Sequence, residues 1–151
     1  MLKIASPSAF ADLAGEEIGV SDWLEVDQGI INAFAEATGD RQWIHVDTAR
    51  AAREMPGGKT IAHGYLLLSL IPRLAPEIFT VEKRSRSLNY GTNKVRFTSP
   101  VPSGARIRLR QAVAAAEPIE GGIRLIMTST MELEGQDRPA LVAETISLIY
   151  D

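Results

Sequence analysis

The chain has 151 residues, of which 45% are hydrophobic and 23% charged, and its formal net charge is −3. This length fits a single globular domain over residues 1–151, which buries roughly 70% of the surface of the unfolded chain. The sequence contains no cysteine, and this excludes disulfides, thiolate metal sites and a cysteine nucleophile. A reducing compartment is compatible with this composition, and we expect the protein in the cytoplasm.

No stretch of the sequence predicts a membrane span or a signal peptide. The uncharged, mostly apolar stretch from Thr60 to Pro72 is shorter than the ~20 residues needed to cross a bilayer. Near the N-terminus, Ser6, Pro7 and Asp12 interrupt the uncharged run that a signal peptide needs. The apolar stretch is therefore expected to be a buried helix.

The first half of the chain predicts one strand followed by helices. Ile18 to Val26 contains β-branched residues and predicts a strand. Asp27 can cap a helix that ends at Gly39, because the apolar residues between them recur at helical spacing. Asp47 is placed to cap a shorter helix over Thr48–Glu54.

The second half predicts one enclosed helix followed by strands. Residues from Gly64 to Leu74 are apolar on every side, so the fold should surround this helix, and Pro72 should kink or end it. From Ser85 onward the pattern has period two with turn residues between segments, which predicts strands over Arg86–Tyr90, Lys94–Thr98, Ala105–Ala115, Ile123–Glu134 and Leu141–Tyr150. Helices followed by a block of strands indicate an α+β fold with an antiparallel sheet wrapped around the helix.

Basic residues are concentrated between Lys83 and Ala116. This segment contains eight Lys or Arg and no acidic residue, so the remainder, with 8 basic and 19 acidic residues, nets 8 − 19 = −11. The asymmetry favours a small polyanionic partner, such as a nucleotide-phosphate group or an acidic carrier protein, and the first candidates to bind it are Lys83, Arg84, Arg86 and Lys94. Alternatively, Arg106, Arg108 and Arg110 form the solvated face of a strand. Nucleic acid is a poorer partner because the segment has few aromatic residues and no recognition motif.

A carboxylate and an imidazole lie five residues apart just after the end of the first predicted helix. Asp40 and His45 can converge on one water molecule, which is what acid/base chemistry on a small electrophile requires. A metal site built from His45, Asp47 and His63 is also conceivable, since two histidines and a carboxylate hold iron in some enzymes. The residues alone leave simpler roles open: Asp40 as a solvated turn residue, Asp47 as a helix cap, and His63 as a partner of the backbone.

Three strings of residues together resemble the MaoC-type dehydratases. They are Thr38-Gly39-Asp40 leading to Ile44-His45-x-Asp47, then Ile61-Ala62-His63-Gly64, and Asn89-Tyr90-Gly91 leading to Val95-Arg96-Phe97-x-x-Pro100-Val101-Pro102-x-Gly104. The resemblance runs from about Asp27 to Tyr150 and is strongest to the branch named for nodulation protein N, within the wider group of (R)-specific enoyl-CoA hydratases. It implies a hot-dog fold, in which a curved antiparallel sheet wraps one long helix, usually as a homodimer with active sites near the interface.

The same resemblance implies the reaction and its residues. It implies reversible hydration of trans-2-enoyl thioesters to (R)-3-hydroxyacyl thioesters, with Asp40 and His45 as the catalytic pair and with no metal and no cofactor beyond the coenzyme A or acyl-carrier pantetheine of the substrate. The backbone N–H of Gly64 is expected to stabilise the thioester oxyanion. Further substrate contacts are expected at Gln42, Trp43, Ala62, His63, Tyr65, Asn89, Tyr90 and Gly91.

The sequence also departs from the family pattern and leaves two other functions to test. Many hydratases carry Asn and then Pro where this chain has Gln42 and Trp43, and Trp43 fits the nodulation branch instead. Many hot-dog thioesterases carry an acidic residue in the central helix, but Gly64 to Pro76 contains none. A non-catalytic acyl-thioester binding protein is disfavoured because both Asp40 and His45 are present.

Overall fold

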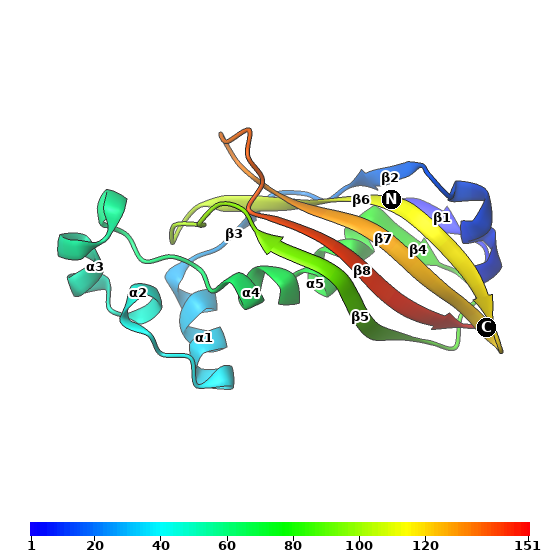
Figure 1. Cartoon of the computed structure of the whole chain (residues 1–151), viewed down its shortest axis with the longest axis horizontal. Coiled ribbons are helices and arrows are strands. Elements are labelled where there is room, and N and C mark those ends of the chain that lie inside the picture. The colour runs from blue at the N-terminus through cyan, green and yellow to red at the C-terminus, as the bar shows by residue number, and fades with distance from the viewer.

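A six-stranded antiparallel sheet is the main element of the computed structural model, which describes all residues 1–151 (Figure 1). The strand order is β2-β6-β7-β8-β5, and β3 pairs with β6 as well. Strand β5 therefore lies at one edge and pairs only with β8. The strands are β2 (Glu17–Val20), β3 (Leu24–Glu25), β5 (Arg86–Phe97), β6 (Arg106–Ile119), β7 (Gly122–Leu133) and β8 (Leu141–Tyr150). This confirms the predicted α+β class with an antiparallel sheet.

Two short helices in succession occupy the place of the predicted enclosed helix. They are α4 (Gly64–Ser69) and α5 (Ile71–Ile78), separated at Leu70. Pro72 lies in the first turn of α5, where its missing N–H costs no hydrogen bond, so the chain resumes a helix there instead of ending it. The predicted end at Leu74 is therefore wrong. No helix in the structure has the length and apolar character needed to cross a bilayer.

The apolar side chains of α4 and α5 pack against the inner face of the sheet. Buried and less buried residues alternate along β6 and β7, as expected when one face of a strand covers a core. Burying each large side chain contributes about 1.5–3 kcal/mol. The helices and strands share one cluster that includes Leu66, Leu67, Leu70, Leu74, Ile107, Leu109, Met131 and Leu141. The sheet thus wraps the helices, as the predicted hot-dog fold requires.

The N-terminal segment adds elements that the sequence patterns did not predict. Strand β1 (Leu2–Ile4) pairs in parallel with β4 (Phe79–Val81), and a 3-10 helix, η1 (Pro7–Leu13), follows it. Phe10 is fully buried there and meets Phe79 edge to face, with ring centroids 5.4 Å apart. These residues belong to a second apolar cluster that closes the end of the sheet away from the start of α4.

Three helices form a lobe beyond the other end of the sheet (Figure 1). As predicted, Asp27 caps the first of them by accepting the Ile30 N–H at 2.8 Å, and Gly39 ends it in the left-handed conformation, with φ of 79°. Asp47 likewise caps the third helix. The elements of the lobe are α1 (Gln28–Thr38), α2 (Trp43–Val46), α3 (Thr48–Glu54) and the 3-10 turn η2 (Pro56–Gly58).

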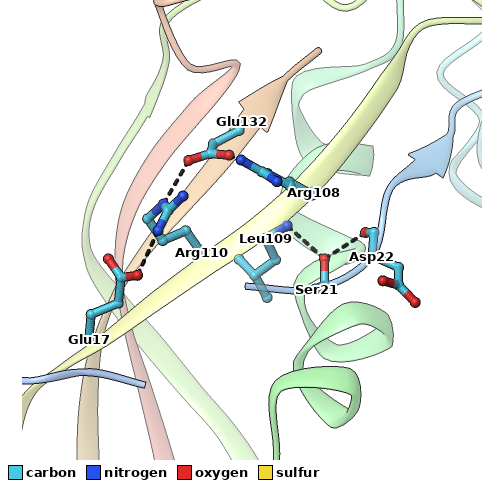
Figure 2. Close-up of polar contacts among 7 residues, drawn as sticks. All are labelled: Glu17, Ser21, Asp22, Arg108, Leu109, Arg110 and Glu132. Carbon is cyan, nitrogen blue, oxygen red and sulfur yellow. Dashed lines mark hydrogen bonds and ion pairs between the residues drawn. The ribbon is translucent and has the colours of Figure 1, made fainter. Parts of the chain in front are cut away.

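Two predicted strand boundaries are wrong. The segment Ile18–Val26 divides into β2 and β3 at Ser21, whose side chain accepts the Leu109 N–H at 2.9 Å and donates to the Asp22 carbonyl (Figure 2). The predicted strands on either side of Gly91 are one strand, β5, because the chain passes Gly91 with a β-bulge instead of a turn. A bulge keeps the strand paired with β8 while it bends.

Candidate active site

Asp40 follows the end of α1 in an exposed turn. The left-handed Gly39 reverses the chain, and the Asp40 N–H then donates to the Thr38 hydroxyl at 3.3 Å. One carboxylate oxygen of Asp40 accepts the Gln42 N–H at 3.4 Å. The turn therefore holds the carboxylate in place while leaving its second oxygen free for another partner.

His45 lies on α2 and is buried, with 7% of its surface exposed. Its Nδ1 is 2.6 Å from the carbonyl oxygen of Ile61. Because a carbonyl only accepts, Nδ1 carries the hydrogen, and Nε2 of the neutral ring has a free lone pair. The structure thus presents His45 as a proton acceptor whose orientation is fixed from behind.

His63 lies directly before α4 and connects the two parts of the site. Its Nε2 donates to the backbone carbonyl of Asp40 at 2.9 Å, and its ring stacks on His45 with centroids 3.8 Å apart and an interplanar angle of 23°. Phe34 covers the ring at 4.9 Å. The remaining nitrogen, Nδ1, is buried and has no partner. A contact with substrate would have to use this nitrogen.

The three side chains converge on a small space. A carboxylate oxygen of Asp40 and one nitrogen each of His45 and His63 lie within 4.8 Å of one another. A water molecule that bonds two acceptors at about 2.8 Å bridges a separation of roughly 4–5 Å, so it fits between Asp40 and His45. The two imidazoles are buried and Asp40 is exposed, so the space opens to the outside on the carboxylate side.

The same three side chains have the composition of a metal site but not its geometry. A metal ion lies close to the plane of an imidazole, about 2 Å from the nitrogen. The stacked rings of His45 and His63 have nearly parallel planes, so an ion between them would lie well out of both. This cluster fits a hydrogen-bonded water better than a cation held by both histidines.

Gly64 begins α4 next to His63 and in contact with β5. A Cβ added to Gly64 would lie 2.7–2.9 Å from ring atoms of Phe97, which is too close for any side chain. The close approach of an aromatic ring therefore accounts for glycine at this position. As the first residue of α4, Gly64 has no intrahelical partner for its N–H.

Gln28 was missed by the sequence analysis and braces the site. Its amide nitrogen donates to the His45 carbonyl at 2.7 Å, and its amide oxygen accepts the Thr60 hydroxyl at 2.5 Å. It therefore ties α2 to the segment that leads into α4. No sequence signal marks it, because glutamine in the first turn of a helix is ordinary.

Comparison with known proteins identifies the family. The model of the MaoC like domain matches residues 9–133. The chain belongs to the MaoC-like domain family. It is 46% identical over 147 residues to 3-hydroxyacyl-thioester dehydratase Z of Mycobacterium tuberculosis, with 97% of each chain covered. It is 44% identical over 141 residues to nodulation protein N of Rhizobium leguminosarum bv. viciae, covering 89% of this chain and 85% of that one.

Solved structures confirm the fold of this MaoC-like domain. The monoamine oxidase regulatory protein from Archaeoglobus superposes with a TM-score of 0.79 at 22% identity, covering 100% of this chain and 99% of that one. The unliganded R-hydratase PhaJ1 from Pseudomonas aeruginosa superposes with a TM-score of 0.73 at 21% identity, covering 91% of this chain and 82% of that one. At these identities the likeness concerns the fold.

Not all predicted site residues of the MaoC-like domain lie at the Asp40–His45 cluster. Trp43 is partly buried under the Arg50 guanidinium, Ala62 is buried, and Tyr65 is 69% exposed and packs edge to face on Phe97. The exposed Gln42 precedes α2. The three predicted residues of β5 line a separate cavity of about 500 Å³ between α4–α5 and the sheet: Asn89, Tyr90 and Gly91.

The basic segment divides into paired and unpaired charges. On the outer face of the sheet Glu132 accepts from Arg108 at 2.5 Å and from Arg110 at 2.7 Å, and Arg110 also reaches Glu17 (Figure 2). Partial burial acts to raise the pKa of Glu132, but the hydrogen bonds from Arg110 and Arg108 outweigh it and lower that pKa. By contrast, no carboxylate pairs with Lys83, Arg84, Arg86 or Lys94.

Proposed function

We propose that this protein is a hydro-lyase that catalyses the reversible hydration of trans-2-enoyl thioesters to (R)-3-hydroxyacyl thioesters, with Asp40 and His45 as its acid/base pair. The observation that carries the proposal is the convergence of the Asp40 carboxylate and an imidazole nitrogen on a space the size of one water. The relative named a 3-hydroxyacyl-thioester dehydratase, which matches over almost the whole chain, supports the same class of reaction.

The reaction needs one proton removed and one delivered. The oxygen of the bound water forms a bond to C3 of the enoyl group, and the pair takes up the proton that this water loses. The electron pair of the double bond moves toward the thioester oxygen, and C2 then accepts a proton from the pair. Asp40 and His45 therefore end in the protonation state in which they began. Dehydration follows the same steps in reverse.

Gly64 is the proposed donor to the developing oxyanion. Negative charge gathers on the thioester oxygen during the addition, and an N–H group that already points at this position stabilises it without reorganisation. The Gly64 N–H is free of intrahelical partners and follows His63, which is bonded to Asp40. The thioester would then lie between the start of α4 and the Asp40 turn.

The acyl chain is proposed to lie between α4–α5 and the sheet. The helices and β5 run side by side in opposite directions: Gly64 faces Phe97 at one end, and Leu68 and Ser69 line the cavity together with Tyr90 farther along. Leu68 is one helical turn, about 6 Å, beyond Gly64. A chain that starts at Gly64 therefore reaches the cavity after a few carbon atoms.

The proposal includes a homodimer in the cytoplasm with a coenzyme A or carrier-protein thioester as substrate. Strand β5 is a long unpaired edge, and edges of this kind are usually covered. It exposes Leu88, Tyr90 and Phe97 by 47%, 59% and 45%, so a second copy has apolar surface to bury there. Of the unpaired basic side chains near β5, Arg86 and Lys94 lie outside the acyl cavity and offer partners for the phosphates of coenzyme A.

The test follows loss of enoyl-thioester absorbance with crotonyl-CoA and longer 2-enoyl-CoAs. Asp40→Asn and His45→Gln should each reduce kcat by about 10²–10⁴-fold, the usual contribution of an acid or base. Asp137→Asn, in an exposed turn and outside any ion pair, is the matched control and should retain full activity. Release of free thiol would identify a thioesterase, and absence of any turnover on all chain lengths would indicate a binding protein.

A further inference from the structure

Three polar side chains form a hydrogen-bonded row across the inner face of the sheet, one on each central strand. They are Gln111 on β6, Ser129 on β7 and Thr145 on β8, and Gln111 lies opposite Ser129 in the strand register. Gln111 is 3% exposed and Ser129 is fully buried. Both Gln111 and Thr145 line the cavity between the helices and the sheet. Buried polar groups are costly unless they are bonded, so their partners matter.

The hydrogen bonds along this row run in one direction. The Thr145 hydroxyl donates to the Met127 carbonyl at 3.5 Å, so it accepts from the Ser129 hydroxyl at 3.1 Å. Because the Ser129 hydroxyl has only one hydrogen to donate, it acts as the acceptor toward the Gln111 amide nitrogen, also at 3.1 Å. The amide oxygen of Gln111 remains at the head of the row, and it is buried without a partner. The row therefore lacks one hydrogen-bond donor.

The chemistry of the cavity restricts what this donor can be. None of its lining residues is acidic, and Arg84 is its only charged side chain, so a cationic group has no counter-charge there. Much of the lining is apolar, including Leu125 and Met127 on β7, the strand next to that of Gln111. A neutral donor carried on an apolar chain fits this combination. A hydroxyl group is the smallest such donor.

We propose that the enzyme prefers acyl chains that carry a hydroxyl group remote from the thioester, and that Gln111 is the residue that recognises it. This inference rests on the proposed function, because it takes the cavity as the continuation of the acyl site that begins at Gly64. The hydroxyl donates to the Gln111 amide oxygen and completes the row through Ser129 and Thr145. An unsubstituted chain leaves that oxygen unpaired and is penalised.

The experiment measures binding by calorimetry, without turnover. The probes are dodecanoyl-CoA and its 8-, 10- and 12-hydroxy derivatives, which lack the reactive double bond and the 3-hydroxyl. One of the hydroxylated probes should bind about tenfold more tightly than dodecanoyl-CoA. The position of its hydroxyl group then shows which carbon of the acyl chain lies next to Gln111. Equal or weaker binding of all three hydroxylated probes to the unaltered protein would overturn the inference, with no variant needed.

A near-isosteric variant assigns the preference to Gln111. Gln111→Met should abolish the tenfold preference by weakening only the hydroxylated probe, whereas Gln136→Met, in an exposed turn, should retain it. A preference that survives in Gln111→Met would overturn the assignment. Enoyl-CoA hydration, assayed on the same preparations, keeps the two proposals apart: hydration without a hydroxyl preference defeats the inference alone, and the preference without hydration defeats the proposed function alone.

Discussion

The two polar clusters of this protein differ in whether their side chains are paired with one another. On the outer face of the sheet, Arg108, Arg110, Glu132 and Glu17 bond to one another in a closed network (Figure 2). In the space between the lobe and α4, one ring nitrogen of each histidine donates to a backbone carbonyl, and the other nitrogen has no partner within the protein. A closed network stabilises the fold, whereas groups left open at fixed positions can act on a ligand.

The two clusters should therefore have opposite effects on the free energy of unfolding. Groups held without partners in a buried place lower stability, and substitutions there often raise it at the expense of activity. Groups that pair with one another contribute to stability, and their charges are already balanced. Substitution in one cluster should therefore change activity, and substitution in the other should change the free energy of unfolding.

Outside the catalytic pair, the largest effect is expected at His63. Replacing it with Leu removes the hydrogen bond to the Asp40 carbonyl and the stack on His45, so both members of the pair lose a support. We expect kcat to fall about 100-fold, the size of effect that follows from misplacing a catalytic group by about 1 Å. His63→Gln, which retains an N–H donor, should recover part of this loss. Steady-state kinetics with crotonyl-CoA would test it, and a loss confined to KM would contradict a positioning role.

The outer network should respond with stability and with a defined dependence on pH. Glu132→Gln should lower the free energy of unfolding by about 1–2 kcal/mol at neutral pH while leaving kcat unchanged. The Arg110 and Arg108 hydrogen bonds lower the pKa of Glu132 against the opposing effect of burial. The stabilisation from Glu132 is then complete at pH values above its ordinary pKa of 4.5. It is lost as the pH falls through the lower pKa that Glu132 has in the folded protein.

Urea denaturation of both proteins from pH 7 down to pH 3 would measure this difference. The difference in free energy of unfolding between the unaltered protein and Glu132→Gln should be constant above about pH 5 and should become smaller below it. Thr130→Ser, a mild change beside Glu132 on the same strand, is a control that leaves the ion pairs in place. A difference that does not change with pH would mean that the charge of Glu132 contributes nothing.

A smaller effect is expected from the basic side chains that the outer network leaves unpaired. Changing Arg86 and Lys94 to Gln together should raise KM for crotonyl-CoA about three- to tenfold with little change in kcat, as loss of uniform binding does. The difference should shrink at high salt because exposed charges are screened. Arg138→Gln, also outside any ion pair, is the matched control. An unchanged KM would remove these residues from the coenzyme A site.

The features that local sequence determines were predictable. The caps at Asp27 and Asp47 and the glycine that ends α1 depend on bonds between neighbours in the chain, and all three are as predicted. The family strings also indicated the fold. Features that depend on contacts between distant segments could not be predicted. Whether Gly91 makes a turn or a bulge depends on β8, and the break at Ser21 depends on Leu109 of another strand.

The candidate site divides in the same way. The spacing of Asp40 and His45 was visible, but their supports are backbone carbonyls and a glutamine, which carry no pattern in a sequence. The unpaired oxygen of Gln111 is likewise hidden, because only the register of β6 with β7 shows that Ser129 takes its amide nitrogen. The sequence gives the type of each residue, but only the structure shows which of its hydrogen-bonding groups lack a partner.

The last prediction tests what the open nitrogens at the site are for. If Asp40, His45 and His63 held a catalytic metal, dialysis against EDTA would abolish hydration and added Zn²⁺ or Fe²⁺ would restore it. We expect no change in kcat, because the stacked imidazole planes, 23° apart, do not direct two lone pairs at one ion. Loss and metal-dependent recovery of activity would show that the rings rearrange on binding, and the cluster would then be a closed network like the outer one, completed by a cation instead of by substrate water.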